Sequence, residues 1–308
     1  MNLSLPSMCK ALSSVALMAA ALLLAACSPL PLINSLVPSK TYQVTRDIAY
    51  GAGPRQQLDV YVPAGMAPDA KAPVVVFFYG GNWDAGQRGD YLFAGEAFAS
   101  QGLVTVVADY RLYPQVRYPA FLEDSAAAFA WTLKNAARFG GDAQRIYVAG
   151  HSAGAYNAAM LAFDPEYLKA AGVDPRAVRG FIGLAGPYDF LPLRSAELQT
   201  IFGGPDTSPL TQPITYVGHG NPMPPSLLLT GAKDKTVDPG NSARLAQSLR
   251  AAGGEVEQIV YPDLSHSGIL GALAAPLRNH YGPVLQDITA FIRQGSATRS
   301  PTPAAAQK

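Results

Sequence analysis

The chain contains little cysteine, histidine and charge, and each shortage narrows what its folded part can do. Its 308 residues include only two cysteines, Cys9 and Cys27, so the sequence beyond residue 27 can form neither a disulfide nor a cysteine-based metal site. Charged residues make up 15% of the chain and the net charge is +1, which argues against a surface that binds nucleic acid. With 49% hydrophobic residues, the chain is predicted to be globular rather than disordered.

The N-terminus carries the signature of an exported protein. Lys10 precedes an apolar run over residues 11–26, which at 16 residues is shorter than the roughly 20 that a membrane-spanning helix needs. Residues 1–26 are therefore predicted to be a signal peptide. The run ends in Leu-Ala-Ala before Cys27, which resembles the lipobox of bacterial lipoproteins. Two alternatives are a signal peptide beside which Cys27 is incidental, and an uncleaved membrane anchor.

The lipobox resemblance implies that Cys27 is lipidated and that residues 27–40 tether the domain to a bacterial membrane. Ser28, rather than an aspartate, follows the cysteine, and by the same resemblance this points to the outer membrane and its periplasmic face. Proline-rich sequence in the tether favours a stiff linker. The C-terminal segment, residues 296–308, is rich in Ser, Thr, Pro and Ala and is predicted to be a disordered tail.

Residues 41–295 alternate between strand-like and helix-like segments. Uniformly apolar runs predict buried strands of a parallel sheet, and a more polar run predicts a strand nearer its edge. Amphipathic stretches over residues 120–139 and 241–252 predict helices that cover the sheet. Two early segments with alternating polarity, residues 42–50 and 57–62, predict an antiparallel edge. The predicted strands of the main sheet are residues 74–79, 103–108, 145–149, 181–185, 226–230 and 256–261.

This alternation predicts an α/β fold with a doubly wound, mostly parallel sheet and helices on both faces. A Pro/Gly-rich stretch over residues 186–225 interrupts the rhythm and is predicted to be a short insertion. It could roof a substrate pocket, or it could be a surface excursion whose aromatic residues only fill the core.

A serine motif lies between a predicted strand and a predicted helix. Residues 150–154 read Gly-His-Ser-Ala-Gly, the pattern of a nucleophile elbow, in which a sharp turn exposes the serine and glycines let strand and helix approach. The pentapeptide alone is weak evidence, but here it has the required context. Ser152 is therefore the predicted nucleophile.

A serine hydroxyl needs a base to remove its proton, and a third group must orient that base. The chain has four histidines. His266 follows the strand that ends at residue 261, which places it at the same sheet edge as Ser152, and it is the predicted general base. His219 and His280 are predicted to be surface or packing residues. His151, next to the nucleophile, is predicted to be structural, with its ring turned away.

The third group is predicted to be Asp234, directly after the strand over residues 226–230. The order Ser, Asp, His along the chain matches the α/β-hydrolase arrangement. Asp238 and Asp263 are rival carboxylates, and Asp234 could instead be a loop residue paired with a neighbouring lysine.

Stabilisation of the developing oxyanion needs main-chain N–H groups. Residues 79–83, Tyr-Gly-Gly-Asn-Trp, follow a predicted strand beside the elbow. Amides in the turn over Gly80, Gly81 and Asn82, together with the N–H of Ala153, are predicted to form an oxyanion hole. A plain glycine turn is the alternative, and a phosphate-binding loop is disfavoured because no Gly-Lys-Ser/Thr follows.

Taken together, these motifs resemble α/β-hydrolase esterases of the carboxylesterase and hormone-sensitive-lipase-like group, in particular bacterial esterases related to feruloyl/acetylxylan esterases and kynurenine formamidases. The resemblance covers roughly residues 45–293. It differs at Tyr79, where the family usually has histidine. Asp109 and Arg111 are predicted to brace the sheet edge. The motifs are residues 79–83, 109–114 (Asp-Tyr-Arg-Leu-Tyr-Pro), 140–142 (Gly-Gly-Asp), 150–154, 231–234 (Gly-Ala-Lys-Asp) and 265–266 (Ser-His).

The resemblance implies a serine esterase that cleaves small-molecule carboxylic esters through an acyl-enzyme, without a metal or organic cofactor. The same triad could serve an arylformamidase, another amidase or a peptidase, and acyl transfer to an acceptor other than water stays open. A third possibility is a surface lipoprotein that keeps the fold for binding alone. No oligomeric state is predicted.

Overall fold

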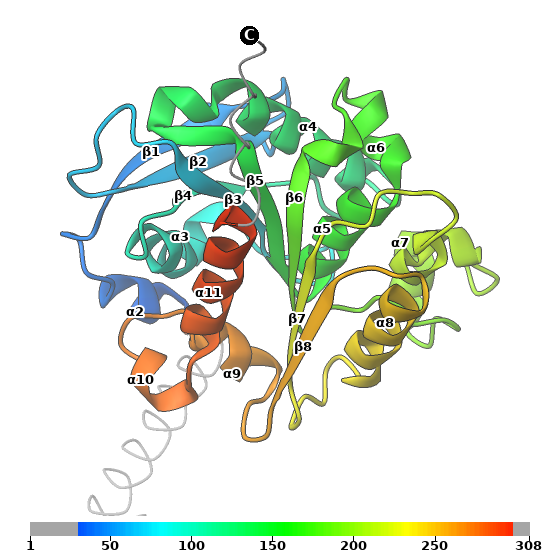
Figure 1. Ribbon diagram of the computed structural model, residues 1–308. Coiled ribbons are helices and arrows are strands. Elements are labelled where there is room, and N and C mark those ends of the chain that lie inside the picture. Colours follow the sequence, from blue (N-terminus) through cyan, green and yellow to red (C-terminus); the bar gives the residue numbers. More distant parts are fainter. Residues whose placement is uncertain (1–29, 298–308) are drawn as a thin grey trace, which may run out of the picture.

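A computed structural model describes residues 30–297 of the chain, which form one sheet enclosed by helices (Figure 1). The predicted signal peptide, Cys27 and residues 298–308 lie outside the described residues. Within the described part, no helix is long and apolar enough to cross a membrane.

The sheet has eight strands in the order β1-β2-β4-β3-β5-β6-β7-β8. Strand β2 runs antiparallel to both β1 and β4, and all other neighbours are parallel. The predicted α/β class and the antiparallel edge are thus confirmed. The strands are β1 (Tyr42–Ala49), β2 (Gln57–Pro63), β3 (Ala72–Phe78), β4 (Val104–Ala108), β5 (Gly141–His151), β6 (Val178–Leu184), β7 (Ser226–Gly231) and β8 (Val256–Tyr261).

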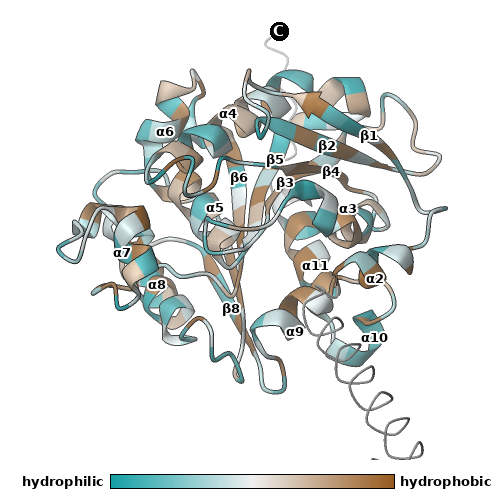
Figure 2. Cartoon of the chain, turned by 180° about the vertical axis from the view of Figure 1, so that it is seen from behind, coloured by the Kyte–Doolittle hydropathy of each residue, from teal (hydrophilic) through white to brown (hydrophobic). Residues whose placement is uncertain are grey.

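Hydrophobicity accounts for which strands are central. Strands β3 and β4 consist almost entirely of buried, mostly β-branched residues, as both faces of the central sheet are covered. Edge strands β1 and β8 instead contain exposed positions along their length. In Figure 2 the hydrophobic strands lie at the centre of the molecule, with hydrophilic residues on the surrounding helices.

Helices cover both faces of the sheet. Helices α3 (Leu92–Ala99) and α11 (Val284–Ala297) pack on one face, and α4 (Ala120–Asn135), α5 (Ala153–Phe163) and α8 (Gly240–Ala251) lie on the other (Figure 1). The remaining helices are α2 (Leu30–Ser35), α6 (Pro165–Ala170), α7 (Ala196–Phe202), α9 (His266–Gly271) and α10 (Arg278–Tyr281), with 3₁₀ turns η1 (Arg88–Tyr91), η2 (Ala136–Phe139), η3 (Pro175–Ala177), η4 (Pro209–Thr211) and η5 (Pro213–Tyr216).

Two segments differ in detail from the sequence expectation. The predicted helix over residues 120–139 splits into α4 and η2, because the chain tightens before Gly140, whose φ of 72° ends the helical run. Within the predicted tether, helix α2 is held against the domain: Asn34 donates from Nδ2 to the carbonyl of Asp90 at 3.0 Å and accepts from the Phe93 N–H at 3.2 Å.

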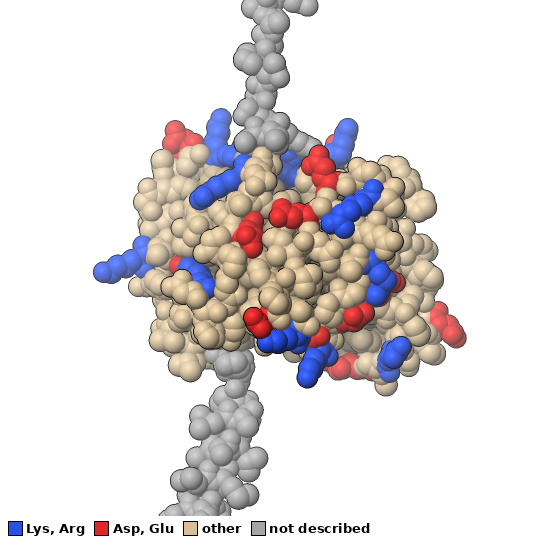
Figure 3. Space-filling view, turned by 60° about the horizontal axis from the view of Figure 1, so that its bottom comes forward, with Lys and Arg blue, Asp and Glu red and all other residues tan. Residues whose placement is uncertain are grey.

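The surface carries both signs of charge. On the face shown in Figure 3, Lys and Arg side chains alternate with Asp and Glu. This agrees with the near-neutral composition, and that face offers no extended basic area for a nucleic-acid backbone.

Candidate active site

Ser152 stands on a sharp turn between β5 and α5. Its backbone has φ 54° and ψ −124°, a conformation that costs a non-glycine residue energy and persists only where the surroundings enforce it. The two flanking positions have no room for a side chain, so both must be glycine. A methyl group on Gly154 would lie 2.1 Å from the Phe78 carbonyl oxygen, and one on Gly150 would lie 2.3 Å from the Gly154 carbonyl. The predicted elbow is thus present.

Asp234 and His266 meet across two loops. The His266 ring donates from Nδ1 to Asp234 Oδ2 at 2.8 Å. The Asp234 side chain is fully enclosed, and its Oδ1 accepts from the main-chain N–H groups of Thr236 and Val237, both at 2.9 Å. These bonds fix the carboxylate and leave Nε2 of His266 as the free ring nitrogen.

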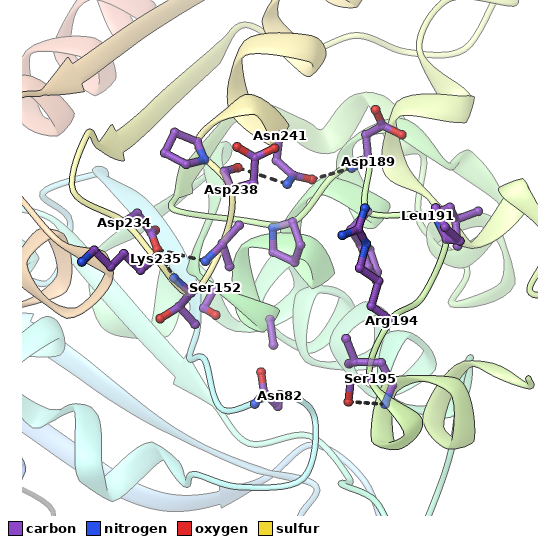
Figure 4. Close-up of a pocket in the computed structure, with 18 of the residues that line it drawn as sticks. Asn82, Ser152, Asp189, Leu191, Arg194, Ser195, Asp234, Lys235, Asp238 and Asn241 are labelled. Atoms are coloured by element: carbon purple, nitrogen blue, oxygen red, sulfur yellow. Dashed lines mark hydrogen bonds between the residues drawn. The ribbon is translucent and has the colours of Figure 1, made fainter. Parts of the chain in front are cut away.

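The three predicted triad residues come from one edge of the sheet. Strands β5, β7 and β8 are parallel members of it, and Ser152, Asp234 and His266 each follow the carboxyl end of one of them. Ser152 and Asp234 line the same cavity (Figure 4). Among the described residues, no hydrogen bond joins the Ser152 hydroxyl to the His266 ring; such contacts are often long until substrate binds.

His151 is buried and is not among the residues that line the cavity, which fits the structural role predicted for it. Its Nε2–H donates to the main-chain carbonyl of His266 at 3.0 Å, and the two imidazole rings are 4.6 Å apart. Burial, and to a lesser extent the neighbouring His266, lowers the pKa of His151 to about 3. His151 is therefore a neutral, buried support for the backbone of His266.

The glycine loop lies directly beside the elbow. A methyl group on Gly80 would sit 2.9 Å from the Ser152 Cβ. Within the described residues, the N–H groups of Gly81, Asn82 and Ala153 have no hydrogen-bond acceptor. Free main-chain amides beside a serine nucleophile are what an oxyanion hole requires.

Tyr79 occupies the position where the related esterases usually have histidine, and a buried network holds it. Its hydroxyl donates to Asp109 at 2.8 Å and accepts from Arg55 at 2.7 Å. Its ring lies between those of Tyr91 and Tyr110, with centroids 5.2 Å and 4.9 Å away, and burial raises the pKa of Tyr79. The tyrosine thus stays neutral and clamps the start of the oxyanion loop.

Asp109 has a wider task than bracing the sheet edge. It also accepts hydrogen bonds from Arg88, one from the side chain and one, at 2.7 Å, from the main-chain N–H. Arg55 in turn donates a hydrogen bond to the Gly86 carbonyl at 2.7 Å. The brace therefore extends to the far end of the loop. Arg55 and Arg88 could not be assigned from the sequence, because neither stands in a recognisable motif near the loop. Arg111 pairs with Asp124 on α4 at 2.8 Å.

The inserted stretch, residues 186–225, both lines the cavity and fills part of the core. Phe190 and Leu191 line the cavity, which encloses about 830 Å³, with Arg194 on the same wall. Tyr188 and Phe202 are instead buried in the core. The wall and the core filling come from one segment.

The rival residues have other partners. Asp263 is exposed and pairs with Lys233 at 2.7 Å, while Asp238 contacts Arg244 at 3.4 Å. His219 and His280 are exposed, as predicted. In the part of the chain that the structure covers, no three His, Cys, Asp or Glu side chains are gathered as a metal site would need.

Comparisons with known proteins show the family of the chain. The family model named BD-FAE matches residues 58–249. The chain belongs to the BD-FAE family. Esterase LipC of Mycobacterium tuberculosis is 30% identical over 289 residues, which are 88% of this chain and 70% of LipC.

Isoprenylcysteine alpha-carbonyl methylesterase ICME of Arabidopsis thaliana is 29% identical over 269 residues, 81% of this chain and 62% of that protein. The chain thus spans less than two thirds of the length of this and the similar plant relatives.

Solved structures share the fold. A carbohydrate esterase from gut microbiota, in truncated form, has a TM-score of 0.72 at 20% identity and covers 85% of this chain and 99% of its own. Apo Thermogutta terrifontis esterase 2 has a TM-score of 0.67 at 23% identity and covers 86% and 98%. The fold of this BD-FAE member is that of α/β-hydrolase esterases.

Proposed function

We propose that this protein hydrolyses carboxylic esters of small molecules through an acyl-enzyme on Ser152. The observation that carries the proposal is the strained elbow of Ser152, which opens into a cavity together with Asp234, whose carboxylate is hydrogen-bonded to His266 at 2.8 Å. Support comes from esterase relatives such as LipC and from structural neighbours, one of them phosphonylated by sarin.

In the first half-reaction, the Ser152 hydroxyl attacks the ester carbonyl carbon while Nε2 of His266 accepts its proton. Asp234 stabilises the charged imidazolium, and the free amides of Gly81 and Ala153 donate to the oxyanion. The proton then passes from His266 to the leaving alcohol. Water, activated by the same histidine, releases the acid and restores Ser152.

One triad can attack both esters and amides, so the test compares the two substrate classes directly. Purified full-length protein and Ser152→Ala should be compared on short p-nitrophenyl esters, N-formylkynurenine and peptide anilides. We expect turnover of the esters to exceed that of the amides and to fall by at least about 10³-fold in Ser152→Ala.

Equal ester turnover by the two proteins would reassign the nucleophile. A preference for the formamide or the anilides would make the protein an amidase on the same triad. A folded protein that turns over none of the three classes would favour a binding role.

A further inference from the structure

The carboxamide of Asn82 is a polar group of the cavity wall that the predicted triad and the predicted main-chain donors leave without a role. Asn82 lines the cavity together with Ser152 and Ala153. Figure 4 shows Asn82 below Ser152 among the residues that line the cavity.

The backbone at Asn82 is fixed in a conformation that few residues adopt. Asn82 has φ 49° and Trp83 has φ 61°, in the left-handed region where glycine and asparagine are the usual residues. Trp83 anchors the turn: its indole N–H donates to Asn157 at 2.9 Å, and its carbonyl accepts from the Tyr113 N–H at 2.8 Å. The backbone at Asn82 is thus fixed beside the cavity, and its exposed side chain lies on the cavity wall.

Conformation alone does not explain an asparagine here. Glycine satisfies a positive φ at lower cost, and the His-Gly-Gly-Gly motif of lipases and esterases has glycine at the corresponding position. The carboxamide of Asn82 makes no hydrogen bond among residues 30–297. It can therefore turn either its oxygen or its nitrogen toward Ser152 without breaking a contact.

We propose that Asn82 is a further catalytic residue, whose Nδ2–H donates a hydrogen bond to the oxyanion beside the main-chain amides of Gly81 and Ala153. This proposal rests on the proposed function. As Ser152 Oγ bonds to the carbonyl carbon and its proton moves to His266, the carbonyl π electrons move onto oxygen, and Asn82 meets that charge. When the intermediate collapses, the electron pair of the oxyanion re-forms the C=O bond and the bond from carbon to the alkoxy oxygen breaks. His266 gives its proton to that oxygen, and the alcohol leaves.

A side chain placed this way acts on the transition state more than on the bound ester, because the hydrogen bond strengthens as negative charge develops. Its removal should lower kcat and leave KM almost unchanged. Loss of one side-chain oxyanion donor in a serine hydrolase costs about 10²–10³-fold in kcat, and a donor that supplements two main-chain amides should cost roughly 10–10³-fold.

Two substitutions separate the side chain from the backbone. Asn82→Gly keeps the positive φ and the main-chain N–H but deletes the carboxamide, and Asn82→Asp keeps the shape but replaces the donor by a carboxylate. The control is His219→Gly, since His219 has φ 56° on an exposed turn outside the cavity and reports the effect of relieving a left-handed residue alone. Thermal melting establishes that each variant is folded.

Kinetics on a p-nitrophenyl ester and inhibition by a trifluoromethyl ketone, a transition-state analogue, are the readouts. We expect kcat to fall roughly 10–10³-fold in both Asn82 variants, with KM within about threefold and affinity for the ketone falling in parallel with kcat. His219→Gly should match the unmodified protein.

Wild-type kcat in folded Asn82→Gly would overturn the proposal, as would a rise in KM at unchanged kcat, which would assign Asn82 to ground-state binding. These outcomes differ from failure of the proposed function, in which the unmodified protein itself shows no turnover that depends on Ser152.

Discussion

Both carboxylate oxygens of Asp234 accept hydrogen bonds, Oδ1 from two main-chain amides and Oδ2 from the His266 ring. Asp234→Asn would place an amide N–H or oxygen where the carboxylate now fixes the ring tautomer. We expect kcat to fall by about 10⁴ with little change in the melting temperature, as measured on a p-nitrophenyl ester.

Asp263→Asn is the matched control, because Asp263 is exposed and pairs only with Lys233 among the described residues. Loss of activity in this variant, with activity kept in Asp234→Asn, would exchange the two assignments.

His151 couples stability to pH. Its pKa is lowered from 6.5 to about 3 in the fold, so below pH 6.5 the unfolded chain binds a proton that the folded protein cannot. The contribution is complete above pH 6.5 and is lost as the pH falls toward 3. We expect the free energy of unfolding to fall about 1.4 kcal/mol per pH unit more steeply in the unmodified protein than in His151→Gln.

Urea unfolding between pH 6.5 and 4 measures these slopes, and His280→Gln, at an exposed histidine, should behave as the unmodified protein. Parallel slopes for all three proteins would mean that His151 is protonated within the fold.

At the scale of elements, the oxyanion loop depends on a brace built from distant strands and turns. Tyr79→Phe would remove the hydroxyl between Asp109 and Arg55 and leave both groups with one partner fewer. We expect about 1–3 kcal/mol lower stability and, because the loop loses its fixed position, a fall in kcat/KM of roughly tenfold or more.

Tyr147→Phe is the control for this loss. Tyr147 on β5 is also buried and donates to the Ile292 carbonyl at 3.1 Å, away from the cavity. The Tyr147→Phe variant should be less stable than the unmodified protein but equally active. Equal effects of the two substitutions on kcat/KM would show that the Tyr79 network does not position the loop.

The crossing of α5 over β3 requires a glycine. Because a methyl group at Gly154 would lie 2.1 Å from the Phe78 carbonyl oxygen, Gly154→Ala should push the elbow off the sheet and lower stability by at least about 1–3 kcal/mol, with loss of turnover. Gly89→Ala is the control, as nothing lies within 4 Å of the added methyl group. Chemical denaturation compares them, and an unaffected Gly154→Ala would contradict this packing.

At the scale of the whole molecule, local pattern sufficed for the sheet and the triad candidates. Apolar runs marked the strands, and the position of Ser152, Asp234 and His266 after strand ends implied one common edge. Local sequence pattern could not predict the network that holds the oxyanion loop, because Arg55 and Tyr79 are far apart in the sequence and meet only in the folded chain. Nor could it show that His151 supports His266, since that contact links the end of β5 to the first residue of α9.

Attachment to a membrane through a lipid on Cys27 is a prediction for the full-length protein. If Cys27 is lipidated, full-length protein produced in bacteria with an alkyne-bearing palmitate should carry the label, and Cys27→Ser should lose it. Cys9→Ser is the control and should keep the label. An unlabelled parent protein, or label lost from Cys9→Ser alone, would contradict the lipobox assignment.

We propose that Ser152 is the activated nucleophile of the cavity. The most direct measurement is mass spectrometry of full-length protein treated with a fluorophosphonate, followed by peptide mapping. We predict a single adduct on the peptide that contains Ser152, slowed strongly in Asp234→Asn and absent in Ser152→Ala. An adduct on another residue, or none on a folded protein, would contradict the account.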